Sequence, residues 1–121
     1  LPVEDYHLTH PPEGFDGTRV GEKFRDTPEA ARITQLRGNS LTFDYGPWEG
    51  TVDLVFVDGG HDYTCGLADS RNALKLVRPG GWIFWDDFTP RWHGLVRGIA
   101  EATAGRDVAW LEGTSFAVLR C

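Results

Sequence analysis

Short apolar runs alternate with segments of helical periodicity along most of the chain. Residues 51–57 (TVDLVFV) predict a buried strand, because the run is rich in β-branched and aromatic residues and lies between glycines. Over residues 62–77, apolar or small side chains recur at nearly helical spacing, and residues 78–81 (RPGG) follow as a stop signal for a helix. A second apolar run, residues 82–85 (WIFW), predicts a second strand directly afterwards.

The rest of the sequence predicts smaller elements before and after this strand–helix–strand unit. They are a short helix within residues 20–32 with Thr27-Pro28-Glu29 as its start signal, a brief strand at 33–36 that stops at the turn Gly38-Asn39-Ser40, an amphipathic helix at 92–104, and strands at 108–111 and 115–119. The last two strands are joined by residues 112–114 (EGT), which favour a hairpin.

This alternation predicts the fold class. We expect an α/β, Rossmann-like and mostly parallel sheet, with helices on its faces and an antiparallel hairpin at its C-terminal end. Closely spaced prolines and glycines make residues 1–21 a loop-like arm, and residues 22–121 form the α/β core of one domain. Trp82 and Trp85 are expected to pack in the core, and Cys65 to be a small buried hydrophobe.

The charge balance narrows the choice of partner. With 12 Lys and Arg against 18 Asp and Glu the net charge is −6, and the basic residues are scattered, so we expect no nucleic-acid partner. No apolar run approaches the roughly 20 residues of a membrane-spanning helix, so we expect no membrane partner either. A small-molecule substrate is therefore favoured.

Two cysteines are too few for a disulfide framework, which favours the cytoplasm as the location of the protein.

Acidic side chains follow both central strands. Asp58 comes directly after the first strand, and Asp86 and Asp87 follow the second. Ligands of open α/β sheets bind beyond the carboxyl ends of the strands, and neighbouring strands lie about 5 Å apart, so we expect these carboxylates to converge. Converging carboxylates repel one another unless a cation lies between them, and oxygen ligands suit Mg²⁺, Ca²⁺ or Mn²⁺ better than Zn²⁺. The alternative is structural: Asp58 forms a turn with Gly59, and Asp87 caps the following segment.

His61 lies shortly after Asp58, on the loop that leaves the same strand. Beside a divalent cation and a bound hydroxyl, this histidine has the chemistry of a general base. The alternative is a histidine at a helix start that only hydrogen-bonds the loop. Among the tryptophans, Trp92 is the best candidate for a role at the surface.

These segments resemble a known family. The run DLVFVDGGHDY, then a helix, then LVRPGGWIFWDDF resembles the second half of a class I S-adenosylmethionine-dependent methyltransferase. The likeness is closest to small-molecule and macrolide-sugar O-methyltransferases that bind a divalent metal. It extends over residues 32–121 and is most specific over residues 52–88. The ordered set carries the resemblance, since a PGG sequence before a strand is common by itself.

The resemblance implies roles for particular residues. Asp58, Asp86 and Asp87 match the family's Mg²⁺ ligands, and His61 matches the loop position of a base that removes the proton of a substrate hydroxyl. The oxygen then attacks the methyl group of S-adenosylmethionine. The turn Gly38-Asn39-Ser40 matches the turn that approaches the adenine of this cofactor. Many relatives have aspartate where Asn39 stands, so an amide replaces a carboxylate in that contact.

The chain also departs from the family. Such enzymes begin with a strand, a glycine-rich loop of the acidic-x-Gly-x-Gly type, a helix and a second strand, and no such loop is present in this sequence. We therefore expect the first two strands and the loop to be missing, which leaves open sheet edges. The chain has no methionine and begins at Leu1, so we expect a processed or incomplete protein that binds the cofactor weakly or not at all.

Two other functions compete with a methyltransferase. One is a Mg²⁺-dependent phosphoryl-transfer or receiver-like domain, which also clusters acids at strand ends but needs a lysine near the site. Lys23 and Lys75 are the only lysines, one before the core and one late in a helix. The other is a non-catalytic, methyltransferase-like interaction module, in which an exposed sheet edge pairs with another copy to form a homo-oligomer.

Overall fold

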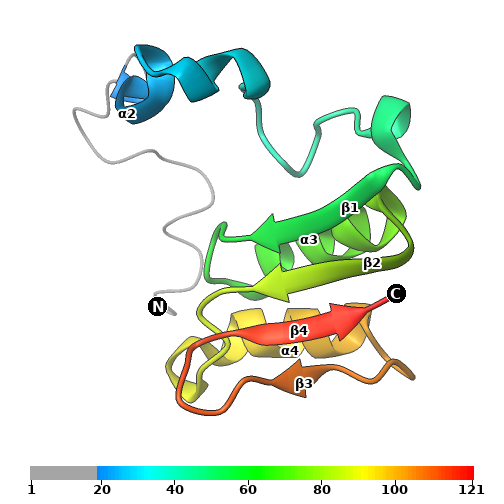
Figure 1. Cartoon of the computed structure of the whole chain (residues 1–121). Helices are drawn as coiled ribbons and strands as arrows, with labels where there is room; N and C mark the ends of the chain where they lie inside the picture. The colour runs from blue at the N-terminus through cyan, green and yellow to red at the C-terminus, as the bar shows by residue number, and fades with distance from the viewer. Residues whose placement is uncertain (1–18) are drawn as a thin grey trace.

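A computed structural model describes residues 19–121, and its main feature is a four-stranded sheet in the order β1-β2-β4-β3 (Figure 1). The principal elements are β1 Val52–Val57, α3 Tyr63–Leu76, β2 Val77–Trp85, α4 His93–Ala102, β3 Ala109–Trp110 and β4 Ala117–Arg120. Both long helices lie on the same face of the sheet (Figure 1). No helix within residues 19–121 combines the length and apolar character that crossing a bilayer requires. The arm predicted at residues 1–21 lies mostly outside the described residues.

The expected helix within residues 20–32 is two short helices, α2 Glu22–Arg25 and the 3₁₀ helix η3 Pro28–Arg32. Thr27 separates them, because its hydroxyl donates a hydrogen bond to the carbonyl oxygen of Phe24 at 2.8 Å instead of capping the next helix. The segment Thr27-Pro28-Glu29 therefore starts a 3₁₀ helix and not an α-helix. A further 3₁₀ helix, η4 Gly46–Trp48, precedes β1.

The strand predicted at residues 33–36 is wrong. These residues have no regular secondary structure, and Ile33 and Leu36 are 43% and 51% exposed. A strand is stabilised by hydrogen bonds to a neighbouring strand and by burial of one face. Within residues 19–121 the segment has neither, so its apolar residues do not make it a strand.

The predicted strand, helix and strand form the centre of the fold. Helix α3 begins after Asp62, whose Oδ1 accepts a hydrogen bond from the backbone nitrogen of Cys65 at 3.0 Å. The helix ends at Leu76 and β2 follows at once, so the expected stop signal lies inside the strand. The glycine of this signal has a role in the strand itself. A Cβ on Gly81 would lie 2.7 Å from the carbonyl oxygen of Asp53, so only glycine lets β2 approach β1 so closely.

The sheet is mixed. Strands β1 and β2 are parallel, with Val57 opposite Trp85, and the β3–β4 pair is antiparallel as predicted. Strand β4 also pairs antiparallel with β2, with Trp85 opposite Ala117. The α/β fold class is confirmed, but the expectation of a mostly parallel sheet is wrong for residues 19–121, where only the β1–β2 pairing is parallel, because β4 returns antiparallel beside β2.

The core lies between the sheet and its two helices. Trp85, Ile83 and Ile99 are fully buried, and the indole nitrogen of Trp85 donates to the hydroxyl of Ser70 at 2.9 Å. The core position of Trp85 is therefore confirmed. The expectation for Trp82 is wrong, because it is 41% exposed: side chains of a strand alternate between faces, and Trp82 points away from the helices.

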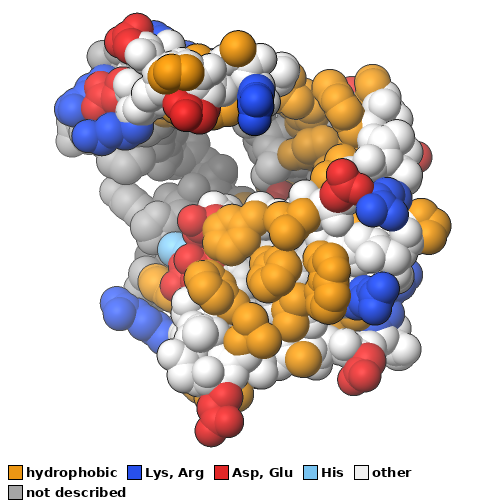
Figure 2. Space-filling model, in the orientation of Figure 1, with side chains coloured by type: hydrophobic (Ala, Val, Ile, Leu, Met, Phe, Trp, Pro, Cys, Tyr) orange, Lys and Arg blue, Asp and Glu red, His pale blue; other side chains and the backbone are white. Residues whose placement is uncertain are grey.

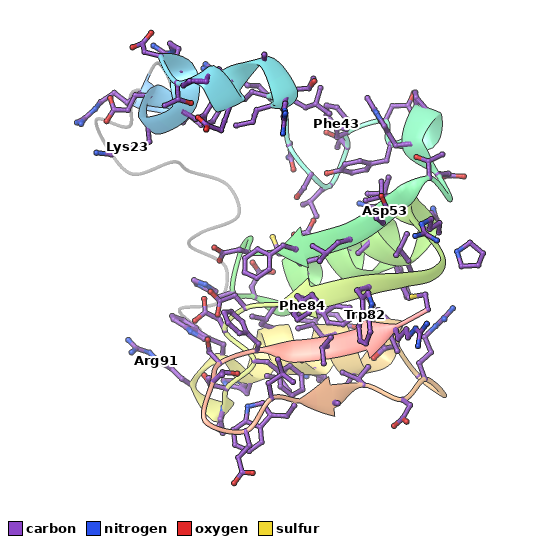
Figure 3. All side chains as sticks on the ribbon, viewed as in Figure 1. Lys23, Phe43, Asp53, Trp82, Phe84 and Arg91 are labelled. Carbon is purple, nitrogen blue, oxygen red and sulfur yellow. The ribbon has the colours of Figure 1, made fainter. Side chains whose placement is uncertain are left out.

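The face of the sheet opposite the helices is apolar and open. Leu54 and Phe56 of β1 are 52% and 51% exposed, and Trp82 and Phe84 of β2 stand beside them (Figure 3). Figure 2 shows the resulting hydrophobic patch over the strands. Parallel strands are usually covered on both faces.

Two glycines let α3 and α4 touch backbone to backbone. A Cβ added to Gly66 would lie 2.8 Å from the carbonyl oxygen of Leu95. One added to Gly98 would lie 2.6 Å from both the Leu67 nitrogen and the Tyr63 oxygen. These contacts set how closely the helices lie against each other.

The substitution Gly98→Ala tests this contact. The new methyl group would collide with backbone atoms that cannot rotate away, so the helices must separate, and we expect a loss of about 2 kcal/mol in the free energy of unfolding. Urea unfolding followed by circular dichroism measures the change. Ala100→Ser, at an exposed position of the same helix, should cost less than about 0.5 kcal/mol. Equal losses in the two variants would contradict the glycine contact.

The two cysteines should differ in reactivity. Cys65 is 7% exposed, which agrees with the sequence prediction, and burial, followed by the nearby Asp62, raises the pKa of its thiol to about 12. Cys121 is only partly buried. Iodoacetamide at pH 8 should therefore alkylate Cys121 in the folded protein and Cys65 only after unfolding, as judged by peptide mass spectrometry. Rapid alkylation of Cys65 in the folded protein would contradict this assignment.

Candidate functional site

The carboxyl ends of β1 and β2 bring three carboxylates together. Asp58, Asp86 and Asp87 each offer one oxygen, and these oxygens all lie within 4.8 Å of one another. The cause is the parallel register: Val57 lies opposite Trp85, so the residues that follow leave the sheet side by side. We call these three residues the carboxylate cluster. Their convergence is as expected, and their role as metal ligands stays a prediction.

Asp86 is held by hydrogen bonds from two directions. Its Oδ1 accepts from the hydroxyl of Ser115 at 2.6 Å and from the backbone nitrogen of Asp87 at 2.7 Å. The Ser115 bond, then the Asp87 nitrogen, lowers the pKa of Asp86, because both donors favour the ionised form. The backbone nitrogen of Phe88 also donates to the carbonyl oxygen of Ser115 at 2.8 Å, which fixes the loop after β2 to the segment just before β4.

Sequence reasoning missed Ser115. It lies 29 residues from Asp86 and meets it because β4 pairs with β2. No local pattern in the sequence predicts the contact between Ser115 and Asp86.

Asp87 connects the carboxylate cluster to His61. Its backbone has φ 56°, the left-handed region that aspartate tolerates better than most residues. This conformation places its Oδ2 at 2.7 Å from Nε2 of His61. In the tautomer that carries a proton on Nε2, this nitrogen donates a hydrogen bond to the Asp87 carboxylate.

The His61 ring also lies against Trp92. The two ring centroids are 4.3 Å apart and the ring planes differ by 18°, so the rings are stacked. Trp92 ends the 3₁₀ helix η5 Pro90–Trp92, directly before α4, and the guanidinium of Arg91 lies 5.1 Å from its ring centroid. Trp92 is thus partly exposed and in contact with a predicted site residue.

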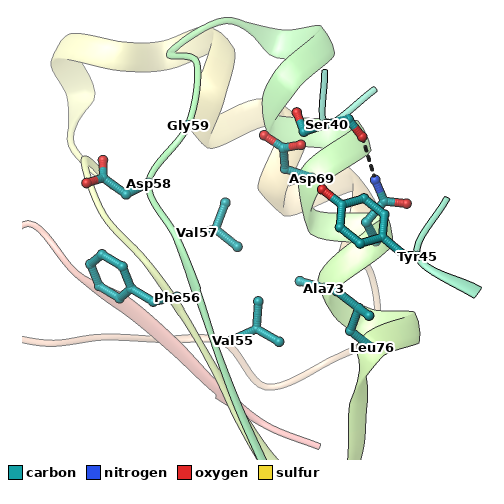
Figure 4. A pocket seen from close by; sticks show the side chains of 11 residues that line it. Ser40, Tyr45, Val55, Phe56, Val57, Asp58, Gly59, Asp69, Ala73 and Leu76 are labelled. Atoms are coloured by element: carbon teal, nitrogen blue, oxygen red, sulfur yellow. Dashed lines mark hydrogen bonds between the residues drawn. The ribbon is translucent and has the colours of Figure 1, made fainter. Parts of the chain in front are cut away.

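The turn Gly38-Asn39-Ser40 reaches the site through one member. Ser40 lines a cavity of about 320 Å³ that also contains Asp58, with Val55, Val57, Ala73 and Leu76 among its apolar walls (Figure 4). Asn39 accepts a hydrogen bond from the backbone nitrogen of Leu41 at 3.0 Å, which stabilises the turn itself. Gly38 and Asn39 are not among the cavity-lining residues.

Two side chains of α3 hold this turn, and sequence reasoning missed both. Asn72 donates to the carbonyl oxygen of Ser40 at 3.2 Å (Figure 4). Asp69 lines the same cavity, and burial raises its pKa, although a hydrogen bond from Ser40 acts in the opposite direction. Desolvation and then Asp69 raise the pKa of Tyr45, which lines the same cavity. The spacing of Asp69 and Asn72 could have identified them, because residues three apart share one face of a helix.

The carboxylate cluster fits a hard divalent cation. Its three donors are carboxylate oxygens from two adjacent loops, close enough to share one ion. Such a donor set suits Mg²⁺, Mn²⁺ or Ca²⁺, which bind oxygen and commonly keep some positions for water or substrate. Both of the hydrogen bonds described for Asp86 fall on Oδ1, so Oδ2 could coordinate a cation.

Replacing Ser115 tests the electrostatics of this site. In Ser115→Ala the main cause of the lowered pKa is removed, so the pKa of Asp86 should rise toward the ordinary carboxyl value. A lowered folded pKa adds stability above the unfolded pKa and loses it as pH falls through the folded value, so the stability difference between wild type and Ser115→Ala should shrink on acidification. Carbon-13 titration of the Asp86 carboxyl and urea unfolding measure the two effects.

The matched control is Ser115→Thr, which keeps the hydroxyl and should keep the lowered pKa of Asp86. An unchanged Asp86 pKa in Ser115→Ala would show that the hydrogen bond does not set it.

Comparison with known proteins identifies a family for this chain. A family model described as a methyltransferase domain matches residues 5–88, more than half of the chain, and the matched range includes β1, α3, β2 and the carboxylate cluster. A search of curated proteins gives no match. The chain therefore belongs to this methyltransferase domain family, and its α/β fold is that of a class I methyltransferase-like domain.

Proposed function

We propose that this methyltransferase domain transfers a methyl group from S-adenosylmethionine to a hydroxyl of a small molecule, with a divalent cation held by the carboxylate cluster. The observation that carries the proposal is the joint placement of Asp58, Asp86, Asp87 and His61 at the carboxyl ends of β1 and β2. Family membership supports methyl transfer. The metal, the donor and the hydroxyl acceptor are the parts we add.

The carboxylate cluster would hold the cation. When bound, a cation there supplies Lewis-acid polarisation of the acceptor hydroxyl, which weakens its O–H bond. Mg²⁺ is the proposed ion, because the donors are hard carboxylate oxygens. Three ionised groups in such close proximity also gain from the positive charge, which relieves their mutual repulsion.

His61 would remove the proton of the acceptor hydroxyl. A nitrogen of its neutral ring would take this proton, and the Asp87 carboxylate, 2.7 Å from Nε2, would orient the ring. The hydroxyl oxygen attacks the methyl carbon as its O–H bond breaks. The electron pair of the broken carbon–sulfur bond goes to sulfur, which changes from a sulfonium cation to a neutral thioether.

The cavity beside Ser40 is the proposed place of the donor's adenine. Its walls are apolar on β1 and α3, and its rim carries the polar groups of Ser40, Asp69 and Asn72. A flat heterocycle with polar edges needs such a combination. Asp58 belongs both to this cavity and to the carboxylate cluster, so donor and acceptor sites would be adjacent.

The alternative functions receive less support. A phosphoryl-transfer site needs a lysine beside the acids, but Lys23 lies in α2, away from the sheet (Figure 3), and Lys75 is in the last turn of α3, at the opposite end from its Asp62 cap. A homo-oligomer through the β1 edge remains a proposal, supported by the position of β1 at the edge of the described sheet. The cytoplasm is the proposed location, supported by two unpaired cysteines.

Methyl transfer from isotope-labelled S-adenosylmethionine to a panel of phenols and sugar alcohols tests the proposal. Because weak donor binding is expected, the donor is supplied at high concentration, and we expect product that requires Mg²⁺ and disappears with EDTA. His61→Gln should lower kcat by about 10²- to 10⁴-fold, because it removes the base. Asp58→Asn should weaken Mg²⁺ binding in calorimetry, because it removes a charged donor.

Asp107→Asn is the matched control, since this carboxylate is exposed on the loop between α4 and β3. It should change neither kcat nor Mg²⁺ affinity. Full activity of the wild type in EDTA would overturn the metal's role, and full activity of His61→Gln would overturn the base. Bound donor, shown by calorimetry, without methyl transfer to any of the hydroxyl compounds would overturn the proposed reaction.

A further inference from the structure

We infer that Asp69 is the specificity-determining residue of the proposed donor cavity: its side chain accepts a hydrogen bond from the exocyclic amino group of adenine. The inference rests on the proposed function, because it requires the donor's adenine in this cavity. It also goes beyond it, since the proposed function does not say how the cavity selects adenine over another purine. The observation is a carboxylate on the wall of a cavity of about 320 Å³ that is otherwise largely apolar.

The polar part of this cavity is rich in hydrogen-bond acceptors. Its described lining includes two carboxylates, Asp58 and Asp69, and no lysine, arginine or histidine. Ionised carboxylates accept hydrogen bonds and do not donate them, so the lining favours a ligand edge that donates. The amino group of adenine is such an edge, whereas the oxo group of hypoxanthine or guanine would bring an acceptor against a negative charge. Asp58 belongs to the carboxylate cluster, which leaves Asp69 to contact the base.

The Asp69 carboxylate lies between the two loops that border the cavity. Ser40, in the turn before β1, gives it a hydrogen bond, and a Cβ on Gly59, in the loop after β1, would lie 2.8 Å from its Oδ2. Figure 4 shows the carboxylate beside Ser40, on the side of the cavity that α3 forms. Because a carboxylate has about four lone-pair positions, the Ser40 bond orients Asp69 and leaves it able to accept from a ligand.

The turn that the family resemblance assigns to the adenine does not supply this contact through its own amide. Oδ1 of Asn39 accepts from the backbone nitrogen of Leu41 at 3.0 Å, and Asn39 is not among the cavity-lining residues. Helix α3 supplies the polar groups instead. Asn72 donates to the carbonyl oxygen of Ser40 at 3.2 Å, and Asp69, one turn earlier, presents its carboxylate to the cavity.

Titration of the protein with adenosine and with inosine, followed by nuclear magnetic resonance, tests the inference without metal, sulfonium or acceptor. The two nucleosides share the ribose, but inosine has an oxo group in place of the amino group and a proton on N1. We expect the wild type to bind adenosine roughly 10- to 100-fold more tightly than inosine. Shifts in the methyl signals of Val55 and Ala73, which line the cavity, should accompany binding.

Asp69→Asn separates recognition of the base from support of the turn. An amide of the same shape both donates and accepts, so it can meet either purine, and the preference for adenosine should fall below about threefold. A residue that only holds the Ser40 turn would weaken both nucleosides equally and leave the preference unchanged. Asp69→Ser replaces Asp69→Asn if the latter does not fold, and it should lose the preference in the same way.

Asp107→Asn is the matched control, because this carboxylate is exposed on the loop between α4 and β3. It should keep the wild-type preference for adenosine and the wild-type affinity for both nucleosides.

The outcomes distinguish the two claims. A wild-type preference in Asp69→Asn, or equal affinity of the wild type for the two nucleosides, overturns the role of Asp69 and leaves the proposed function in place. Binding of neither nucleoside, or binding that leaves the Val55 and Ala73 signals unchanged, overturns both the role of Asp69 and the placement of the adenine. A preference that follows the prediction, in a protein that binds the donor but transfers no methyl group, overturns the proposed reaction and leaves the selection of adenine by Asp69 in place.

Discussion

The parallel pairing of β1 and β2 is the constraint on which the rest of the structure depends. It fixes both strands at one level, so the residues that follow Val57 and Trp85 leave the sheet side by side. Two parallel strands require a crossover, and α3 supplies it without any residue between its end and β2. The buried bond between Trp85 and Ser70 and the glycine contacts with α4 then hold the crossover against the sheet.

The same pairing brings three carboxylates into mutual repulsion at the strand ends, and it also brings up groups that hold two of them. Asp58, Asp86 and Asp87 converge there, and their charges would separate the two loops if nothing opposed them. Ser115 and the backbone nitrogen of Asp87 hold Asp86, and His61 holds Asp87. A bound cation would complete this balance, which is why the proposed chemistry and the loop structure depend on each other.

The sequence was a good guide where the signal is local. The apolar runs predicted β1 and the end of β2, the spacing in between predicted α3, and the strand ends predicted the carboxylate cluster. It failed where a contact depends on pairing between distant segments. The run at residues 33–36 has the pattern of a strand but no neighbouring strand among residues 19–121, and the Ser115 contact exists only because β4 returns beside β2. The prediction for Trp82 failed because no helix of the described part of the chain covers its face of the sheet, which a local sequence pattern does not reveal.

Crystals of the protein grown with Mn²⁺ and S-adenosylmethionine would test the central claim most directly, through anomalous scattering from the metal. The account predicts one strong anomalous peak within coordination distance, about 2.0–2.3 Å, of oxygens from Asp58, Asp86 and Asp87. Crystals in which Mn²⁺ binds elsewhere, or in which the carboxylate cluster shows no peak at saturating Mn²⁺, would contradict it.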